Sequence, residues 1–187
     1  MTKILPLPVT KNKFGRRVAD ISVEKYYRQI FEEVLEAHRA CIENFQQFSD
    51  DEAEELVDII TCCVTRLHFM HWYSASDDFA EYLQRIVDET SNDYRVDDDF
   101  YIDLTQWVSY AYNAAQISQI VQLMLTEGCG QCAADVEVSE YDEENALAYI
   151  IFLCIKRLEY LGYDESARQK IYAKVNDKNR KRGYFED

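Results

Sequence analysis

Apolar residues recur with the spacing of an α-helix along most of this chain. Residues three and four positions apart lie on one helix face, so such a pattern marks the side that is buried. The first stripe contains Val23, Tyr27, Ile30, Val34, Cys41 and Phe45, widened by Phe31, Leu35 and Ile42, and the second contains Leu56, Ile60, Cys63, Leu67 and Met70. The pattern predicts two consecutive amphipathic helices, near 21–47 and 50–73.

The remaining apolar stripes predict four further helices, near 77–91, 98–127, 141–161 and 165–181. Asp164 stands where an N-cap residue would open the last helix, and Gly162 and Gly183 stand where glycine ends helices. Only two prolines and five glycines interrupt the 187 residues, and alternating β-branched runs are scarce. This composition predicts an all-α chain.

Two acidic pairs stand beside the stripes of the first two predicted helices. Glu33 and Glu36 belong to a run that reads E-E-x-x-E, and Glu55 and Asp58 form an E-x-x-D. Residues three apart on a helix have Cβ atoms about 5–6 Å apart, so each pair can act as a two-carboxylate claw. The short connection through 46–48 favours antiparallel packing, which would bring four carboxylates together.

A cluster of carboxylates is unfavourable unless protons or a cation compensate its charge. All-oxygen sites of this kind suit Mg²⁺ or Mn²⁺, which leave part of the coordination shell to water and substrate phosphates. Acidic residues at this spacing are also common on solvated helix faces. The residues alone therefore leave two interpretations open, a shared metal site and a solvated acidic surface.

The order of these motifs resembles the MazG-like all-α nucleoside triphosphate pyrophosphohydrolases, especially small phage-type members. The E-E-x-x-E run is followed by E-x-x-D on the next helix, and the closing stretch 174–184 is rich in lysine, asparagine and arginine. The opening 5–10 and the run 14–20 fit more loosely. The resemblance covers about residues 5–70 and 150–184 and implies a four-helix-bundle core.

The resemblance implies Mg²⁺-dependent hydrolysis of a nucleoside triphosphate, an NTP or dNTP, to the monophosphate and pyrophosphate, with Mn²⁺ as a possible substitute. It assigns Glu33, Glu36, Glu55 and Asp58 to the metal. Glu32 lies about 100° around the helix from Glu33, so its expected catalytic role is to orient a water or a ligand. The residues that match the substrate-binding segment are Lys174, Asn176, Lys178, Asn179 and Arg182.

The length fits a single all-α domain over 1–187. Within it we distinguish metal-claw helices at 20–73, an acidic segment at 74–140 and closing helices at 141–184. No stretch approaches the roughly 20 apolar residues that span a bilayer, and the N-terminus lacks the apolar core of a signal peptide. We therefore expect a cytoplasmic protein without a membrane partner.

The cysteines and histidines give weak signals. Cys129 and Cys132 form a C-x-x-C, but no second pair or neighbouring histidine completes a zinc site, and a turn through Gly128 and Gly130 explains them better. Three of the six cysteines lie within apolar helical stripes, where a free cysteine behaves as a small hydrophobe, and the three histidines fall within the helical pattern. We expect packing roles for His38, His68 and His71.

The formal net charge of −15 argues against a polynucleotide partner. Residues 71–150 contain 17 Asp/Glu and two basic residues, whereas 168–182 contain seven Lys/Arg and one acid. An anionic nucleotide would thus meet a metal site and a basic helix. The alternative is a non-catalytic interaction protein on the same fold, whose acidic segment binds a basic partner.

The sequence contains an internal echo, which predicts a degenerate duplication unless 71–140 is an insertion. Residues 56–67 and 147–158 share six identities in twelve positions at an offset of 91, with Ala146 and Tyr149 in place of Glu55 and Asp58. Upstream, 29–30 and Leu35 align more weakly with 119–120 and Leu125 at an offset of 90. MazG-like units associate, so we expect a homodimer or a pseudo-dimer within one chain.

Overall fold

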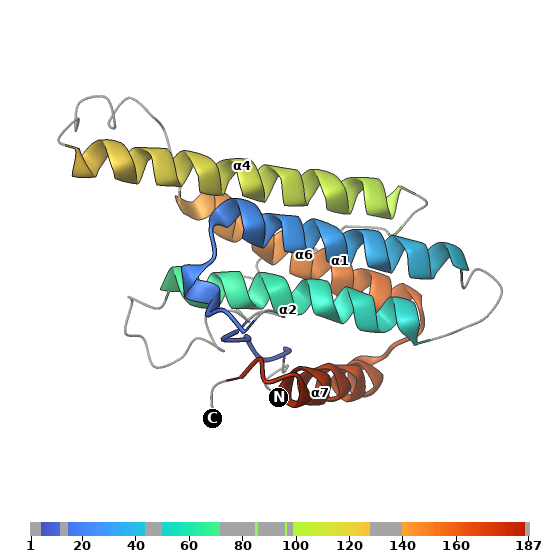
Figure 1. Cartoon of the computed structure of the whole chain (residues 1–187). Helices are drawn as coiled ribbons and strands as arrows, with labels where there is room; N and C mark the ends of the chain where they lie inside the picture. The colour runs from blue at the N-terminus through green and yellow to red at the C-terminus, as the bar shows by residue number, and fades with distance from the viewer. Residues whose placement is uncertain are drawn as a thin grey trace.

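The computed structural model describes residues 5–11, 15–43, 50–71, 85, 96, 99–127 and 140–185 (Figure 1). The elements are η1 (Val18–Asp20), α1 (Val23–Glu43), α2 (Asp51–His71), α4 (Phe100–Thr126), α6 (Glu140–Tyr160) and α7 (Glu165–Lys181). These ranges contain five packed α-helices and no sheet, which confirms the all-α prediction. The helix expected at 77–91 and the pair Cys129 and Cys132 lie outside the described residues, apart from Arg85. Within the described ranges, no helix is both long and apolar enough to cross a lipid bilayer.

Four of the helices close a ring around a common core. α1 packs against α2 and α4, and α6 packs against the same two helices. Figure 1 shows that α1 runs antiparallel to α2 and to α4. The largest fully buried side chains come from all four helices: Tyr27, Ile30, Leu56, Ile59, Ile60, Leu67, Phe100, Leu104, Leu147, Ile150, Ile151 and Leu153. The core therefore holds the two predicted metal-claw helices side by side.

The buried face of α1 is narrower than the sequence pattern predicted. Tyr27, Ile30 and Val34 are buried, but Leu35 and Ile42 are 62% and 63% exposed. The expectation that these two widen the stripe is wrong. Leu35 follows Val34 by about 100° of helical rotation, which turns it away from the line where α1 meets α2 and α4.

Two buried ion pairs connect the helices inside the ring. The Glu143 carboxylate accepts from Arg66 Nε at 2.7 Å and Nη2 at 3.2 Å, and from the Tyr27 hydroxyl at 2.7 Å. The Glu52 carboxylate accepts from Arg157 Nε at 2.8 Å and from the Tyr101 hydroxyl at 2.7 Å. Each carboxylate is thus paired with a cation and a phenol, as a buried charge requires. Together they join α2 to α6, α1 and α4.

The two networks are copies of one another at the sequence offset of 91. Glu52 corresponds to Glu143 and Arg66 to Arg157, and each glutamate pairs with the arginine of the other copy. In α1 and α4 the buried positions coincide at an offset of 74, through the pairs Tyr26 and Phe100, Tyr27 and Tyr101, Ile30 and Leu104, Val34 and Val108, and Ala37 and Ala111. The α1–α2 half and the α4–α6 half therefore share one packing pattern.

The weaker alignment at an offset of 90 is wrong as a guide to packing. It matched Ile30 with Ile120, but Ile30 is fully buried and Ile120 is 50% exposed. The buried partner at the equivalent place in α4 is Leu104. Spacing in the amphipathic pattern repeats every few residues, so a one-helix alignment can slip by whole turns.

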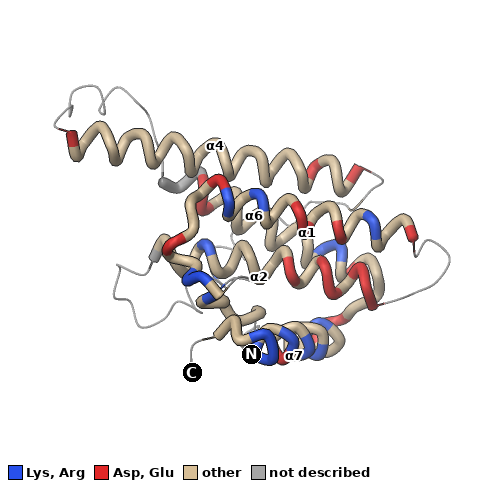
Figure 2. Tube along the Cα trace, viewed as in Figure 1, with Lys and Arg blue, Asp and Glu red and all other residues tan. Residues whose placement is uncertain are grey.

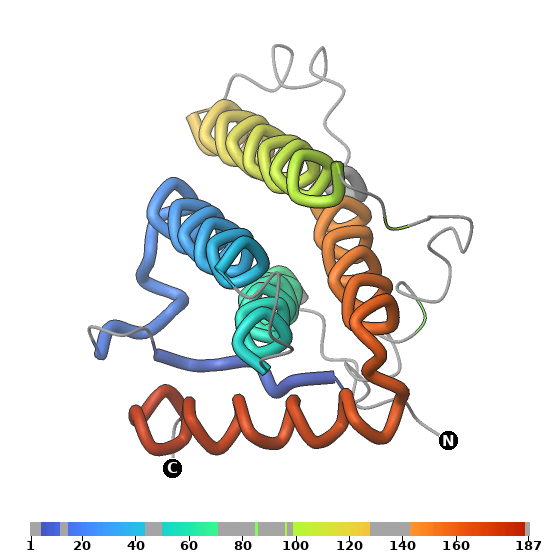
Figure 3. The backbone as a smooth tube through the Cα atoms, turned by 90° about the vertical axis from the view of Figure 1, so that its right-hand side faces the viewer, coloured from blue at the N-terminus to red at the C-terminus, as the bar shows by residue number. Residues whose placement is uncertain are grey.

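The last helix, α7, crosses the bundle instead of joining it. In Figure 3, α1, α2 and α4 are seen nearly end-on while α7 runs across the view, and α7 contacts α2. The turn before α7 contains Gly162 at a φ of +89°, a conformation that favours glycine. The Asp164 carboxylate then accepts from Ala167 N at 2.8 Å, which confirms the predicted N-cap.

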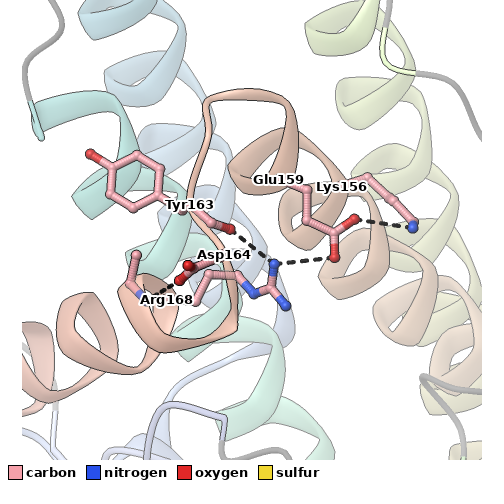
Figure 4. Close-up of polar contacts among 6 residues, drawn as sticks. Lys156, Glu159, Tyr163, Asp164 and Arg168 are labelled. Carbon is pink, nitrogen blue, oxygen red and sulfur yellow. Dashed lines mark hydrogen bonds and ion pairs between the residues drawn. The ribbon is translucent and has the colours of Figure 1, made fainter.

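Side chains around the same turn fix the angle at which α7 leaves α6 (Figure 4). Arg168 Nη1 donates to the Glu159 carboxylate at 3.1 Å and to the Tyr163 carbonyl at 3.0 Å. Lys156 pairs with the other oxygen of Glu159 at 3.1 Å. These contacts place the basic face of α7 against α2.

The N-terminal segment, residues 5–11, connects α7 to the bundle through hydrogen bonds. Leu7 N donates to Asn176 Oδ1 and Val9 N to Thr65 Oγ1, both at 3.0 Å. Thr10 N and the following amide both donate to the Tyr184 carbonyl, at 2.8 and 3.0 Å. Residues 5–11 thereby bridge α2 and the end of α7.

Candidate metal centre

The acidic site is built at the seam between α1 and α2. Glu33 stands between Ile30 and Val34, both buried, so its side chain is held at the edge of the core. On α2, Glu55 and Asp58 are half-buried and flank the fully buried Leu56 and Val57 in sequence. Because the packed neighbours fix both backbones, the three carboxylates have little freedom to move apart.

One carboxylate oxygen each of Glu33, Glu55 and Asp58 lies within 4.8 Å of the other two. Oxygens around a single octahedral Mg²⁺ at about 2.1 Å lie at most about 4.2 Å apart. Small side-chain rotations would therefore bring all three onto one ion. The donor set, three carboxylates without nitrogen or sulfur, is the type that Mg²⁺ and Mn²⁺ prefer.

Glu36 and Glu32 lie at the rim of the site, the exposed edge of α1 next to the triad. Both are exposed, and neither belongs to the triad of closest oxygens. Glu36 is still near enough for its negative charge to raise the pKa of Glu33 and of Glu55. The structure therefore joins three of the four carboxylates that the sequence assigned to metal, and places Glu36 next to them.

The triad carries an excess of negative charge. Burial, followed by the charges of Asp58, Glu36 and Glu55, raises the pKa of Glu33 to about 8. Burial is also the main cause that raises the pKa of Glu55 and of Asp58, although the Lys178 ammonium opposes both shifts. A divalent cation would stabilise the charged form of each of these acids and so lower their pKa values.

This arrangement predicts a pH dependence of stability in metal-free protein. Glu33 has an ordinary pKa of 4.5, so between about 4.5 and 8 the folded state keeps a proton that the unfolded state has released. The free energy of unfolding should then fall as pH rises through this window. Glu33→Gln cannot ionise and should be more stable than wild type at pH 8.

Urea unfolding with a chelator present, repeated from pH 5 to pH 8, measures the effect. Glu43→Gln, an exposed acid at the end of α1, serves as the control and should follow wild type. Parallel stability curves for wild type and Glu33→Gln would show that the triad does not hold a proton in the folded state.

A row of cations on α7 faces the acidic seam. Lys174, Lys178 and Arg182 are spaced four residues apart and so share one helix face. Lys178 forms an ion pair with Asp58, and Lys174 forms one with Glu54, a turn earlier on α2. The positive charge of Arg182 lowers the pKa of Asp58. Figure 2 shows this basic helix beside the acidic stretch of α2.

The two asparagines predicted to bind substrate are placed differently from the cations. Asn176 Oδ1 accepts from Leu7 N, which gives this residue a structural contact with the N-terminal segment. Asn179 is only 4% exposed, and its carbonyl accepts from Tyr184 N at 3.1 Å. The structure thus brings Lys178 to the triad, with Arg182 near enough for its charge to act on Asp58, and leaves Asn176 engaged elsewhere.

Sequence reasoning missed the partners of the buried arginines. Ser49 and Glu52, three positions apart at the start of the second predicted helix, match a capping box, but Ser49 is outside the described residues and the Glu52 carboxylate contacts Arg157 and Tyr101. The spacing held a signal, since a glutamate and an arginine recur together at the offset of 91. The cysteine expectation is confirmed for Cys62, Cys63 and Cys154, which are buried thiols.

The α4–α6 half has an aromatic cluster where the α1–α2 half has acids. At the packing offsets of 74 and 91, Glu33, Glu36, Glu55 and Asp58 correspond to Trp107, Tyr110, Ala146 and Tyr149. The ring of Trp107 lies 4.3 Å from that of Tyr149 and 5.8 Å from that of Tyr110, centroid to centroid. None of these four side chains is a carboxylate, so this place lacks the donors of the triad.

Comparison of the chain with protein-family models, with curated proteins and with solved structures gives no match.

Proposed function

We propose that the protein is a metal-dependent nucleoside triphosphate pyrophosphohydrolase that converts an NTP or dNTP to the monophosphate and pyrophosphate. The observation that carries the proposal is the convergence of Glu33, Glu55 and Asp58 from two helices, directly beside Lys178 on a third. The resemblance of the motifs to MazG-like enzymes, in the same order along the chain, supports this activity. The all-α bundle is also consistent with this activity.

In this proposal Glu33, Glu55 and Asp58 hold Mg²⁺ or Mn²⁺, and Glu36 joins them from the rim by rotation of its side chain. The bound ion would neutralise charge on the phosphate oxygens and lower the pKa of a coordinated water. The partial burial of the triad strengthens the attraction of its carboxylates to the cation. Glu32, exposed one residue before Glu33, would orient a water or a ligand.

The cations of α7 have a separate part. Lys178 forms an ion pair with Asp58. A divalent ion bound at the triad would compensate the negative charge of Asp58 in place of Lys178. The ammonium would then be available to phosphate oxygens, and Arg182 can bind them bidentately. Lys174 is paired with Glu54, a turn away from Asp58, and would contact an outer phosphate of the substrate.

We further propose that the chain is a degenerate duplication with one competent site. The matched burial of α1 with α4 and the exchanged pairs Arg66–Glu143 and Arg157–Glu52 support two halves of common design. The second half lacks the acids and has Trp107 and Tyr149 in contact instead. Its role would be to supply the partner surface against which the metal-claw helices pack.

The proposal predicts that pyrophosphate, and not orthophosphate, is released from at least one triphosphate in a panel of NTPs and dNTPs. Release should require Mg²⁺ or Mn²⁺ and stop when a chelator is added. The measurement is a separate assay of pyrophosphate and orthophosphate for each nucleotide. Orthophosphate as the first product would exclude the proposed bond cleavage.

The alternative, a non-catalytic acidic interaction protein on the same fold, makes a different prediction. We expect such a protein not to bind a nucleotide together with Mg²⁺. Titration calorimetry with Mg²⁺ and a non-hydrolysable triphosphate therefore separates the two functions. Absence of binding by folded wild-type protein would favour the interaction function, and the ion pair of Lys178 with Asp58 would then be structural.

A further inference from the structure

The outer surface of α4 differs in character from the rest of the molecule. Its residues 104–126 include no charged side chain, in a chain that is 29% charged. Six of the ten exposed large hydrophobic side chains in the described part of the chain lie on this helix: Ile102, Tyr110, Ile117, Ile120, Leu123 and Leu125. An exposed apolar surface of this kind marks an interaction site.

The apolar residues concentrate at the C-terminal end of α4. Ile117, Ile120, Leu123 and Leu125 are 42%, 50%, 61% and 57% exposed. The last buried α4 residue is Ala115, so the helix continues for three turns beyond its contact with the core. In Figure 1 this end projects past α1, and in Figure 2 it is free of Lys, Arg, Asp and Glu up to its final turn.

We infer that the C-terminal end of α4, residues 116–126, is the surface through which two copies of this chain pair. Each chain carries a formal net charge of −15, so two copies repel one another overall. Two α4 surfaces meet without that repulsion, because neither carries a charge. The pairing is isologous, with the two helices antiparallel about a two-fold axis.

The polar residues of this surface are self-complementary. Gln116, Gln119 and Gln122 are exposed and lie among the apolar side chains. An amide side chain both donates and accepts hydrogen bonds, so the same residue on an antiparallel copy can satisfy it. A partner recognised by charge would find nothing to pair with here.

This pairing is separate from the association that the MazG-like resemblance implies. The faces that join the two halves, in the contacts of α1 with α4 and α2 with α6, are already buried within one chain. The α4 end lies outside that core. The inference depends on the exposed surface of α4 and stands whether or not the triad binds metal.

Sedimentation equilibrium of the full chain at low micromolar concentration tests the inference. We expect wild type to give about 44 kDa, twice the chain mass of 22.0 kDa. The double substitution Ile120→Asp, Leu123→Asp should weaken pairing by at least about 100-fold and give the monomer mass, because it places charges in an apolar contact. Leu35→Asp, at a residue of α1 that is 62% exposed, is the control and should leave the dimer intact.

Circular dichroism and urea unfolding check that each variant is folded, since all three substituted residues are exposed. A monomeric wild type at tens of micromolar overturns the inference, also if that monomer binds neutral phosphatidylcholine vesicles through α4. A folded double variant that keeps the dimer mass overturns it as well, by placing the pairing surface elsewhere.

Discussion

Glu33→Gln and Asp58→Asn should each reduce pyrophosphate release by at least about 100-fold, for any triphosphate that wild type hydrolyses. Both side chains belong to the triad whose oxygens lie within 4.8 Å, and an amide cannot replace the anionic charge that holds a divalent ion. Loss of a group that merely orients a ligand already costs 10–100-fold in other metal sites, and a direct ligand should matter no less.

The variant Glu36→Gln distinguishes the contribution of the rim residue to turnover from that of the triad. Glu36 is exposed and must rotate to reach the same ion, so we expect a smaller loss, about 10-fold. Glu43→Gln, also exposed on α1, should retain activity within about two-fold and serves as the matched control. Wild-type turnover in both Glu33→Gln and Asp58→Asn would place the chemistry away from this seam.

Glu143→Ala should lower the free energy of unfolding by about 3–5 kcal/mol, the cost of breaking a buried ion pair from one side. The substitution leaves Arg66 buried without its carboxylate, and it removes the acceptor of the Tyr27 hydroxyl. The side chain of Glu143 is 4% exposed and that of Arg66 is 22% exposed, so water cannot readily take over these contacts.

Urea denaturation measures this loss, with the exposed pair Arg28–Glu24 as the comparison. The side chains of that pair are 66% and 62% exposed, so Glu24→Ala should change stability by less than about 1 kcal/mol. The double substitution Arg66→Met, Glu143→Leu should recover much of the loss, since it leaves no unpaired charge. A loss below about 1 kcal/mol for Glu143→Ala would show that this network does not tie the halves together.

Local patterns were enough to predict the five described helices and the position of three acids at the seam between α1 and α2. Periodicity located α1, α2, α4, α6 and α7, because each must bury an apolar face to be stable. Position at the margin of a stripe also placed Glu33 and Glu55 correctly at the edge of the core. These features depend on residues a few positions apart.

Features that depend on distant residues could not be read from the pattern. The pairing of Lys178 with Asp58 spans 120 residues and arises from the angle at which α7 crosses α2. That angle is fixed by the contacts of Arg168 at the turn before α7 and by the contacts of the N-terminal segment. Neither set of contacts has a periodic signature in the sequence. The exposure of Leu35 likewise follows from which neighbours α1 has, and the sequence of α1 does not contain that information.

The proposed metal centre is tested most directly by binding of Mn²⁺ to the full chain, measured by electron paramagnetic resonance with a non-hydrolysable triphosphate present. The proposal predicts that wild-type protein binds Mn²⁺ and that Glu33→Gln and Asp58→Asn, both folded, lose this binding while Glu43→Gln keeps it. Equal Mn²⁺ binding by wild type and by the two triad variants would contradict a metal site at Glu33, Glu55 and Asp58.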